Sequence, residues 1–538
     1  MKIARINLIF LLSLFLITIS ETDGGAYARA YTRTVKVSKN ADLSLILSRP
    51  NTRYIIRYDH NISGKRIEIG QNSTLEFRGG MLRDSKGSGD IIGNGTVIRN
   101  SRGDKIFDGV RFSGSFGGFN VNVAWFGIEY DAVVDNSQAI IEALSLSKLT
   151  SEHTVEITGG SIYVNAHTDN PVSLYDGRIA LYSNCRLVMS DDTYIRVIPS
   201  TERFYSVLYA GLCDNVIIEG GNIIGDLEKH PGTYGEWGYG ICFLGCTNSI
   251  IKNVKISDCW GDGINLDGWR DVTKGGNSGP RVQNKNILIE DVALDRNRRQ
   301  GISISSGQGV VIRNSTIINT GILNGTAPMY GIDIEPMSWD NKVSDITIDN
   351  VNLSNNIGAG IMCIETFDEN NGVNMNRLVV KNCTLSSGEK GKGILQVGGN
   401  DITVENNKGE YFYAHDVKRL TVKNNIFTSA AIFDHFITNE DIIFENNEIY
   451  SPAKSSYALH WNSRCKNYTF RKNTIKMIKS SLTPVYNSVS DREFVVDDCS
   501  IEYVGDVTAD ERVHWPKNLS FFGCRFKGYK GIHGAVVQ

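Results

Sequence analysis

The residues best suited to carry out chemistry lie around a short motif that recurs in the middle of the 538-residue chain. The motif reads Gly-Ile-x-Ile or a close variant, and it begins at Gly240, Gly263, Gly301, Gly331, Gly360 and Gly393. In an extended strand, alternate side chains point to opposite faces, so the apolar pair points inward and the x residue points outward. If such strands stack side by side, their x residues form a column with a spacing of about 4.8 Å.

The outward columns predicted in this way carry several carboxylic acids. The x column reads Cys242, Asn265, Ser303, Asp333, Met362; the next outward position reads Leu244, Asp267, Ser305, Glu335; the position before the glycine reads Tyr239, Asp262, Gln300, Tyr330, Ala359. Paired carboxylic acids can act as general acid and general base. The predicted catalytic residues are Asp262, Arg299, Asp333, Glu335 and Tyr330.

Arginines and tryptophans flank the same columns. The predicted substrate-binding residues are Asn265, Asp267, Trp260, Trp269, Arg270, Arg298 and Gln300. An arginine pairs well with a carboxylate or a sulfate group, and an aromatic ring offers an apolar face. This mixture suits a sugar polymer, and the alternative is a solvated sheet face with charge pairs.

A second repeat indicates the element that must position these residues. It consists of a β-branched or aromatic residue, any residue, Asn or an equivalent, and a small or polar residue, as in Ile251-Lys-Asn253-Val and Val422-Lys-Asn424-Asn. Successive Asn positions are 18 to 38 residues apart, and alternating strand patterns flank them. Asn and Gly tolerate the left-handed backbone that sharp corners need. The repeat therefore predicts an all-β fold, a parallel β-solenoid.

The longest spacings fall where the acidic columns lie. The extra residues form predicted loops at 268–283, 321–329 and 366–376. Long loops on a regular scaffold commonly build a binding cleft. Because Trp269 and Arg270 begin the first of these loops, we expect them to wall the cleft.

The segment before the repeats carries a family resemblance. Trp125-Phe-Gly127, followed by Asp135-Asn-Ser-x-Ala-Ile140, resembles the entry segment of the pectate-lyase-like superfamily of right-handed parallel β-helix proteins. The resemblance covers roughly residues 100–530 and implies a β-helix over 121–538, with a helix near 136–147 that covers its N-terminal end. Residues 31–120 are expected to form a β-rich N-terminal segment. The superfamily includes lyases, hydrolases, esterases, epimerases and phage tailspikes, so the resemblance is specific for the fold rather than for an activity.

A narrower resemblance points to the place of the site. Gly261-Asp262-Gly263 and Gln300-Gly301-Ile look like the polygalacturonase pattern, in which an Asp pair precedes one strand and Gly-His-Gly the next. Here Gly263 replaces the second Asp and Gln300 replaces the His. The Arg-x-Lys that should follow is replaced by Asp333-Ile-Glu335. The match supports the location of the site and speaks against ordinary polygalacturonase activity.

Three functions stay open at this stage. The favoured one is a polysaccharide lyase that cleaves a uronate-containing glycan, such as a glycosaminoglycan or a pectin-like polymer, by β-elimination. A base would remove the C5 proton, while an arginine, a protonated acid or bound Ca²⁺ neutralises the sugar carboxylate. The second is a glycoside hydrolase that uses a carboxylate pair, and the third is a non-catalytic glycan-binding module. Ca²⁺ is the one cofactor that this chemistry suggests.

Composition and the chain start narrow the partners further. The net charge of −3 lacks the basic excess typical of nucleic-acid binders. Lys2, Arg5 and the apolar run 8–19 predict a signal peptide over residues 1–30, because the apolar run is too short to span a membrane. A signal peptide predicts a secreted or periplasmic protein. The ten cysteines show no CxxC spacing. Cys383, Cys499 and Cys524 occupy one repeated position and are expected to be small buried apolar residues. The oligomeric state stays open.

Overall fold

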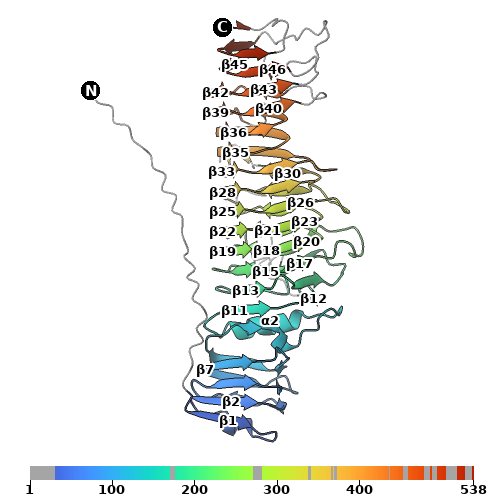
Figure 1. The fold of residues 1–538 in the computed structure, drawn as a ribbon, viewed down its shortest axis with the longest axis vertical. Coiled ribbons are helices and arrows are strands. Elements are labelled where there is room, and N and C mark those ends of the chain that lie inside the picture. The colour runs from blue at the N-terminus through green and yellow to red at the C-terminus, as the bar shows by residue number, and fades with distance from the viewer. Residues whose placement is uncertain are drawn as a thin grey trace, which may run out of the picture.

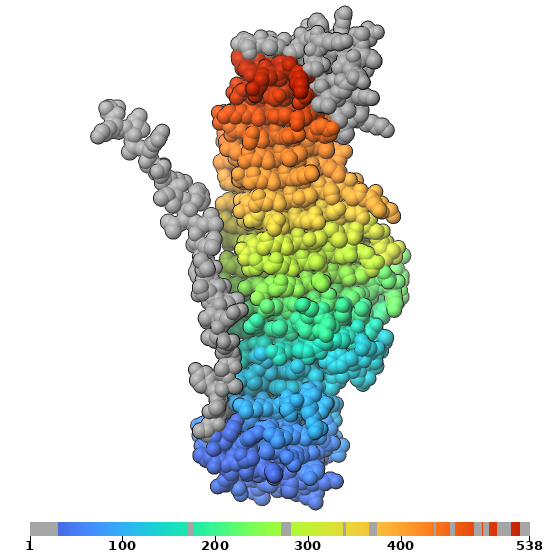
Figure 2. All heavy atoms as spheres, in the orientation of Figure 1, coloured from blue at the N-terminus to red at the C-terminus, as the bar shows by residue number. Residues whose placement is uncertain are grey.

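The computed structural model describes residues 31–169, 176–270, 281–336, 341–364, 367–368, 372–434, 437–451, 458–477, 485–487, 494–503, 518–527 and 536–537. The predicted signal peptide and the middle of the predicted loop at 268–283 lie outside these residues. The chain rises as a column of stacked coils from the N-terminal coils to the C-terminal ones (Figure 1). The space-filling view shows successive coils in direct contact along the column (Figure 2).

Three parallel ladders of strands, which we call sheets 1, 2 and 3, run along the main part of the column. Sheet 1 contains β15 (Phe204–Gly211), β18 (Trp237–Leu244), β21 (Ile264–Asp267), β24 (Ile302–Ile304), β27 (Tyr330–Ile334), β30 (Ala359–Cys363), the first parts of β35 (Ile394–Glu405) and β36 (Tyr411–Lys423), β38 (Ser429–Phe433), β41 (Leu459–Asn462) and β44 (Val485–Asn487).

Sheet 2 contains β10 (Val121–Asn122), β11 (Thr154–Ile157), β13 (Arg186–Met189), β16 (Ile217–Glu219), β19 (Thr247–Lys252), β22 (Lys285–Glu290), β25 (Gly307–Arg313), β28 (Val343–Asp349), β33 (Met375–Lys381), the second parts of β35 and β36, β39 (Glu440–Glu445), β42 (Tyr468–Arg471), β45 (Phe494–Asp497), β47 (Leu519–Phe522) and β49 (Val536–Val537).

Sheet 3 contains β12 (Ser161–Val164), β14 (Tyr194–Val197), β17 (Asn222–Ile224), β20 (Lys255–Ser257), β23 (Ala293–Asp295), β26 (Thr316–Ile318), β29 (Asn352–Ser354) and β34 (Thr384–Ser386). Its upper part contains β37 (Ile426–Phe427), β40 (Glu448–Ser451), β43 (Thr474–Met477), β46 (Ser500–Tyr503) and β48 (Arg525–Lys527). A short antiparallel pair, β31 (Phe367–Asp368) and β32 (Gly372–Val373), lies between β30 and β33.

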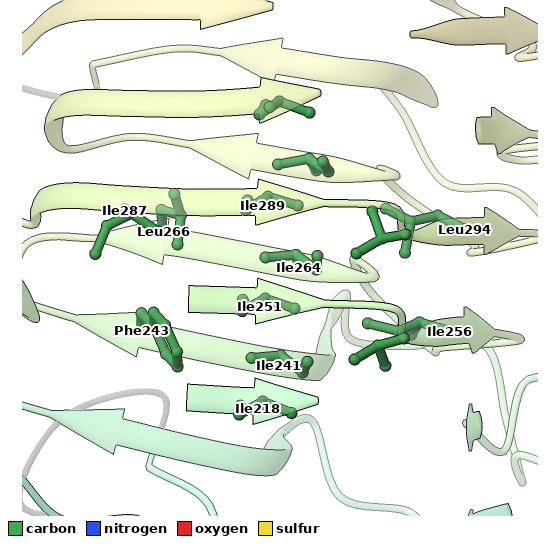
Figure 3. Close-up of a cluster of buried hydrophobic side chains, with 14 of the residues drawn as sticks. Ile218, Ile241, Phe243, Ile251, Ile256, Ile264, Leu266, Ile287, Ile289 and Leu294 are labelled. Carbon is green, nitrogen blue, oxygen red and sulfur yellow. The ribbon is translucent and has the colours of Figure 1, made fainter. Parts of the chain in front are cut away.

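The core lies inside the coils and is built from the apolar pairs of the repeated motif. Ile241 and Phe243 of β18 point inward and meet residues from the other two sheets, including Ile251 and Ile256 (Figure 3). Ile241 pairs with Ile264 on the next strand, which confirms the predicted register of the Gly-Ile-x-Ile strands. The column of identical or similar side chains lets each coil bury its apolar face against its neighbours.

The register corrects one detail of the motif. Ile361 pairs with Leu395, so Leu395 takes the inward place and Gly393 falls one position before Gly360. Leu395 is buried and Ile394 is partly exposed, as this register requires. The prediction that Gly393 takes the place of the motif glycine in that coil is therefore wrong by one position.

The corners between sheets 2 and 3 use the repeated Asn in two ways. Asn253 and Asn424 have φ angles of +56° and +57°, the left-handed conformation that the repeat predicts. The hydrogen-bonded stack is formed by the asparagines that directly follow these corner residues. The backbone N–H of Asn407 donates to Oδ1 of Asn425, and the backbone N–H of Asn425 donates to Oδ1 of Asn447. The stack satisfies backbone groups on neighbouring coils, as expected, but from the position after the corner.

The outer face of sheet 2 carries charges of alternating sign. In register order, neighbouring strands present Glu219, Lys252, Glu290, Arg313, Asp349, Lys381, Glu405, Lys423, Glu445, Arg471 and Asp497. Ion pairs join several neighbours, such as Arg313 with Glu290 at 2.5 Å and Arg471 with Glu445 at 2.8 Å. This column neutralises itself, and a slip of one coil would place like charges against each other.

The N-terminal residues form a smaller set of parallel coils. These contain β1 (Arg33–Val37), α1 (Leu43–Ile46), β2 (Thr52–Ile56), β3 (His60–Asn61), β4 (Arg66–Glu68), β5 (Thr74–Phe77), β6 (Leu82–Arg83), β7 (Asp90–Asn100), β8 (Phe107–Asp108) and β9 (Arg111–Phe116). Every strand pair among them is parallel.

A helical segment separates these coils from the main column. It consists of the 3-10 helix η1 (Val123–Phe126) and α2 (Ser137–Ser147), which lies between β7 and β11 in Figure 1. The resemblance placed this helix over an open end, but the N-terminal coils extend the column beyond it. Asn136 is the N-cap residue of α2, and the side chain of Asp135 accepts the N–H of Ser137 at the helix start. Among the described residues, no helix is long and apolar enough to cross a membrane.

Candidate functional site

The strands of sheet 1 bring the predicted acidic columns together. Asn265, Ser303, Asp333 and Met362 are consecutive register partners on β21, β24, β27 and β30. Asp262, Gln300 and Tyr330 precede the same strands. Glu335 follows β27 and its backbone N–H donates to the carbonyl of Ile304 on β24. The period-2 alternation of the motif therefore predicted correctly which residues share the outer face of sheet 1.

This face is much more closed than an open ladder. Asp262 and Gln300 are fully buried, and Asp333 is only 1% exposed. Tyr330, Glu335 and Arg299 are partly exposed. The site is therefore a buried acidic row whose accessible edge is formed by Tyr330 and Glu335, with Arg299 beside it.

Asp333 lies at the centre of the row. Gln300 donates from Nε2 to Oδ2 of Asp333 at 2.5 Å, and Oδ1 of Asp333 is buried without a hydrogen-bond partner among the described residues. Burial, first, and then the carboxylate of Glu335 raise the pKa of Asp333 well above its usual value, and Arg299 offsets this only in part. These surroundings favour the protonated form of Asp333, and its buried Oδ1 has no hydrogen-bond partner among the described residues.

Asp262 and Arg299 form an ion pair behind this row. The Arg299 guanidinium lies 3.2 Å from Asp262 and 3.7 Å from Glu236. Burial raises the pKa of Asp262 to about 6, although Arg299 acts in the opposite direction. Burial also acts to lower the pKa of Arg299, but Asp262, Tyr239 and Glu236 together hold it above its usual range. Arg299 is a fixed cation, and a role for it as a base does not fit this position.

The accessible edge includes a neutral phenol. Burial raises the pKa of Tyr330, and the carboxylates of Asp333 and Glu335 raise it further. A phenol with a raised pKa keeps its proton and acts as a hydrogen-bond donor or general acid. Tyr330 and Glu335 thus lie at opposite ends of one short strand segment, with Asp333 between them.

Asp267 and Asn265 do not belong to the reactive part of the row. Asp267 accepts from the guanidinium of Arg281 at 2.8 Å, from the N–H of Gly268 at 2.6 Å and from Asn341 at 3.0 Å. A carboxylate with this many donors anchors the start of the 268–283 loop, so its predicted binding role is corrected to a structural one. Asn265 is buried and donates to Sγ of Cys242.

Trp260 and Arg298 were predicted to bind substrate, but the structure buries both. The Arg298 guanidinium stacks on the Trp260 ring at 3.8 Å and donates to the carbonyls of Gly235, Thr233 and Asn324. Their contacts tie the segment 225–236 and the segment 320–326 to the sheet. A tryptophan and an arginine in a motif do not reveal such packing, because the covering segments belong to no repeat.

A residue that the sequence reasoning missed completes this packing. The His230 ring stacks on the Trp260 ring with 3.7 Å between the ring centroids, and Nδ1 of His230 lies 2.8 Å from Asp226. Tyr205 donates to the other oxygen of Asp226 at 2.5 Å. The spacing of four residues between Asp226 and His230 was the available signal. This buried group holds the segment that delivers Glu236 to Arg299.

Trp269 and Arg270 keep positions compatible with a cleft wall. Trp269 is partly exposed, pairs through its backbone with Val282, and packs beside the buried cluster of Tyr209 and Tyr239. Arg270 is also partly exposed. Among the described residues, no group of three or more His, Cys, Asp or Glu side chains could hold a metal ion.

The fold defines the structural class to which the chain belongs. Residues 149–409 match the family model described as "Right handed beta helix region". Together with the three parallel ladders, this match confirms the predicted fold: the chain is a right-handed parallel β-helix protein.

Particular proteins similar to the chain come from bacteria. It is 34% identical over 227 residues to the "Uncharacterized protein YclG" of Bacillus subtilis, covering 40% of this chain and 38% of the relative. It is 29% identical over 216 residues to the "SPbeta prophage-derived uncharacterized protein YorA" of the same species, covering 38% of this chain and 36% of the relative. The chain thus spans less than two fifths of the length of these curated relatives.

A solved structure with a similar fold is the A-module of the mannuronan C-5 epimerase AlgE6 from Azotobacter vinelandii. The TM-score is 0.48 at 15% identity, covering 78% of this chain and 99% of that one. At this identity the similarity concerns the fold alone.

Proposed function

We propose that the protein is a polysaccharide lyase that cleaves a uronate-containing glycan by β-elimination. The observation that carries the proposal is the buried Asp333, whose Oδ1 has no hydrogen-bond partner among the described residues and whose pKa is raised well above its usual value by burial and by Glu335. Along the chain it lies between the partly exposed Tyr330 and Glu335. Abstraction of the proton at C5 of a uronate places negative charge on the sugar carboxylate. A neutral acid beside that carboxylate can donate a hydrogen bond to it without charge repulsion.

The three side chains have complementary roles in this proposal. Asp333 donates from Oδ1 to the sugar carboxylate and stabilises the charge that develops on it. The Glu335 carboxylate accepts the C5 proton as the C5–H bond breaks and the C4–C5 double bond forms. Tyr330 donates its phenolic proton to the O4 oxygen as the C4–O4 bond breaks. Arg299, paired with Asp262, supplies a fixed positive charge beside the row.

The experiment compares the purified protein with its variants on glycosaminoglycans, pectins and alginate. We expect an unsaturated sugar product, followed by its ultraviolet absorbance, and we expect Asp333→Asn and Glu335→Gln to reduce its formation by at least about 100-fold, in keeping with the share of one acid–base group. The exposed turn residue Asp191 offers the matched control, because Asp191→Asn should keep full activity. Full activity in Asp333→Asn would refute the site.

The same pair of acids favours one other reaction, glycoside hydrolysis. A protonated Asp333 two residues from the Glu335 carboxylate has the division into acid and base that a glycosidase needs. New reducing ends without the unsaturated product would support the hydrolase over the lyase. Binding without either product would instead support a glycan-binding function.

A further inference from the structure

Gln300 precedes β24 and is buried, and its amide makes two contacts with the neighbouring strand β27. Nε2 donates to Oδ2 of Asp333, while Oε1 accepts the backbone N–H of Tyr330 at 2.9 Å. The side chain is fully buried, and both polar atoms of its amide are taken by these two contacts. Its predicted role as a substrate-binding residue therefore needs a different interpretation.

The backbone of Tyr330 fixes which way the Gln300 amide points. A backbone N–H can only donate, so the group that faces it must be the amide oxygen. The NH₂ group must then face Asp333, and it can only donate to Oδ2. A flipped amide would place its NH₂ group against the N–H of Tyr330, two donors facing each other, which a buried site does not tolerate.

This orientation decides which oxygen of Asp333 carries the proton. Oδ2 accepts from Gln300, and the carbonyl oxygen of a neutral carboxyl group is a better acceptor than its hydroxyl oxygen, so the proton lies on Oδ1. The charged or titratable groups that face Asp333 are Glu335, Asp262, Arg299 and Tyr330. Two of these are acids, so an ionised Asp333 would add a further buried negative charge beside them.

We infer that Gln300 is a positioning residue that fixes the proton of Asp333 on Oδ1 and thereby selects an anionic acceptor, a sugar carboxylate, as the ligand group at this site. The part about the ligand rests on the proposed function, whereas the position of the proton does not. A hydrogen bond from a neutral acid to a carboxylate is roughly twice as strong as one between neutral groups. The site should therefore prefer an acidic sugar to the same sugar with its carboxylate reduced to an alcohol.

The variant Gln300→Glu tests the inference with almost no change of shape. Its side chain keeps an oxygen toward the N–H of Tyr330 but presents a second oxygen, instead of NH₂, to Oδ2 of Asp333. The proton then lies between the two carboxyl groups, and Oδ1 loses its donor character. Gln71→Glu, the same substitution in an exposed turn of the N-terminal coils, is the matched control.

Two measurements on the full chain decide the outcome. Infrared spectroscopy at neutral pH should show a protonated carboxyl signal that disappears in Asp333→Asn, shifts in Gln300→Glu and is unchanged in Gln71→Glu. Titration calorimetry with a uronate oligosaccharide and its carboxyl-reduced counterpart should show a preference for the acidic sugar of about tenfold or more. Gln300→Glu should abolish this preference and Gln71→Glu should keep it, while thermal melting verifies that both variants fold.

The two ways of failing are distinguishable. If the wild-type protein binds neither sugar, the proposed function fails, and the infrared signal alone still decides where the proton lies. A wild-type spectrum without a signal assigned to Asp333 would overturn the inference. An acidic preference that survives in Gln300→Glu would overturn it as well.

Discussion

The substitution Asp262→Asn tests whether burial or the ion pair with Arg299 dominates the electrostatics of the site. Asp262 is completely buried, with the Arg299 guanidinium 3.2 Å away. Burial raises its pKa from 3.8 to about 6 in spite of that cation. A rise of about 2 pKa units corresponds to about 3 kcal/mol of unfolding free energy.

The sign of the effect follows from the protonation of the two states. Below about pH 4 the carboxyl is protonated in the folded and the unfolded protein, so its burial adds no charge. As the pH rises through about 6, the folded protein must ionise a buried group that the unfolded chain ionises freely. Stability that is present at about pH 4 is therefore lost by about pH 7, by about 3 kcal/mol.

Urea unfolding of the wild-type protein and Asp262→Asn at these two pH values measures this contribution. Because Asn does not titrate, the difference in unfolding free energy should move in favour of the variant by about 3 kcal/mol between about pH 4 and pH 7. Asp191→Asn, at an exposed turn, should show no such movement. A difference that is constant, or that moves in favour of the wild type, would mean that the ion pair outweighs burial and would refute the reasoning.

Three further predictions concern the scaffold. Asn425→Ala removes the hydrogen-bond partner of the Asn407 N–H and of the Val404 and Lys423 carbonyls, so it should destabilise the protein by about 3 kcal/mol or more. Asn424→Ala, at the corner, should destabilise it by only about 1 kcal/mol. Urea unfolding compares the two variants, and equal losses of stability would contradict these different roles. Arg313→Glu places a third negative charge between Glu290 and Asp349. It should destabilise the folded protein by about 1 kcal/mol at low salt and by less at high salt, because these side chains are partly exposed. A loss of stability that does not depend on salt would argue against an electrostatic cause. His230→Gln removes the stacking on Trp260 and should increase amide hydrogen exchange in residues 225–236 well above that of the N-terminal coils; unchanged exchange there would show that His230 does not anchor the segment.

The repeat made the scaffold predictable, and the irregular segments made the site only partly so. The register of Asn265, Ser303 and Asp333 follows from strand alternation, which depends on local pattern alone. The burial of Trp260 and Arg298 depends on segments 225–236 and 320–326, which belong to no repeat. The role of Gln300 depends on the N–H of Tyr330, a backbone group that no residue type encodes.

One feature was in the repeat but was overlooked. The position described as any residue, between the β-branched residue and the Asn, is the alternating column of sheet 2, as Lys252, Glu290 and Arg313 illustrate. Each residue by itself is an ordinary charged side chain on a strand. The alternation becomes visible only when the coils are placed in register, because the signs are then compared between neighbours in space rather than in sequence.

The contrast between sheets 1 and 2 supports a functional role for the acidic row. On sheet 2 each charge faces an opposite charge on the next coil, so the same scaffold can hold a long charged column at little cost. On sheet 1 the acids Asp262, Asp333 and Glu335 are brought together with one arginine, and burial raises the pKa of Asp262 and of Asp333. The scaffold can neutralise its charges coil by coil, yet it leaves the charges unbalanced over three neighbouring coils of sheet 1. This imbalance lowers the stability of the folded protein, and selection for stability alone would have removed it. Such a cost is typical of a site selected for chemistry.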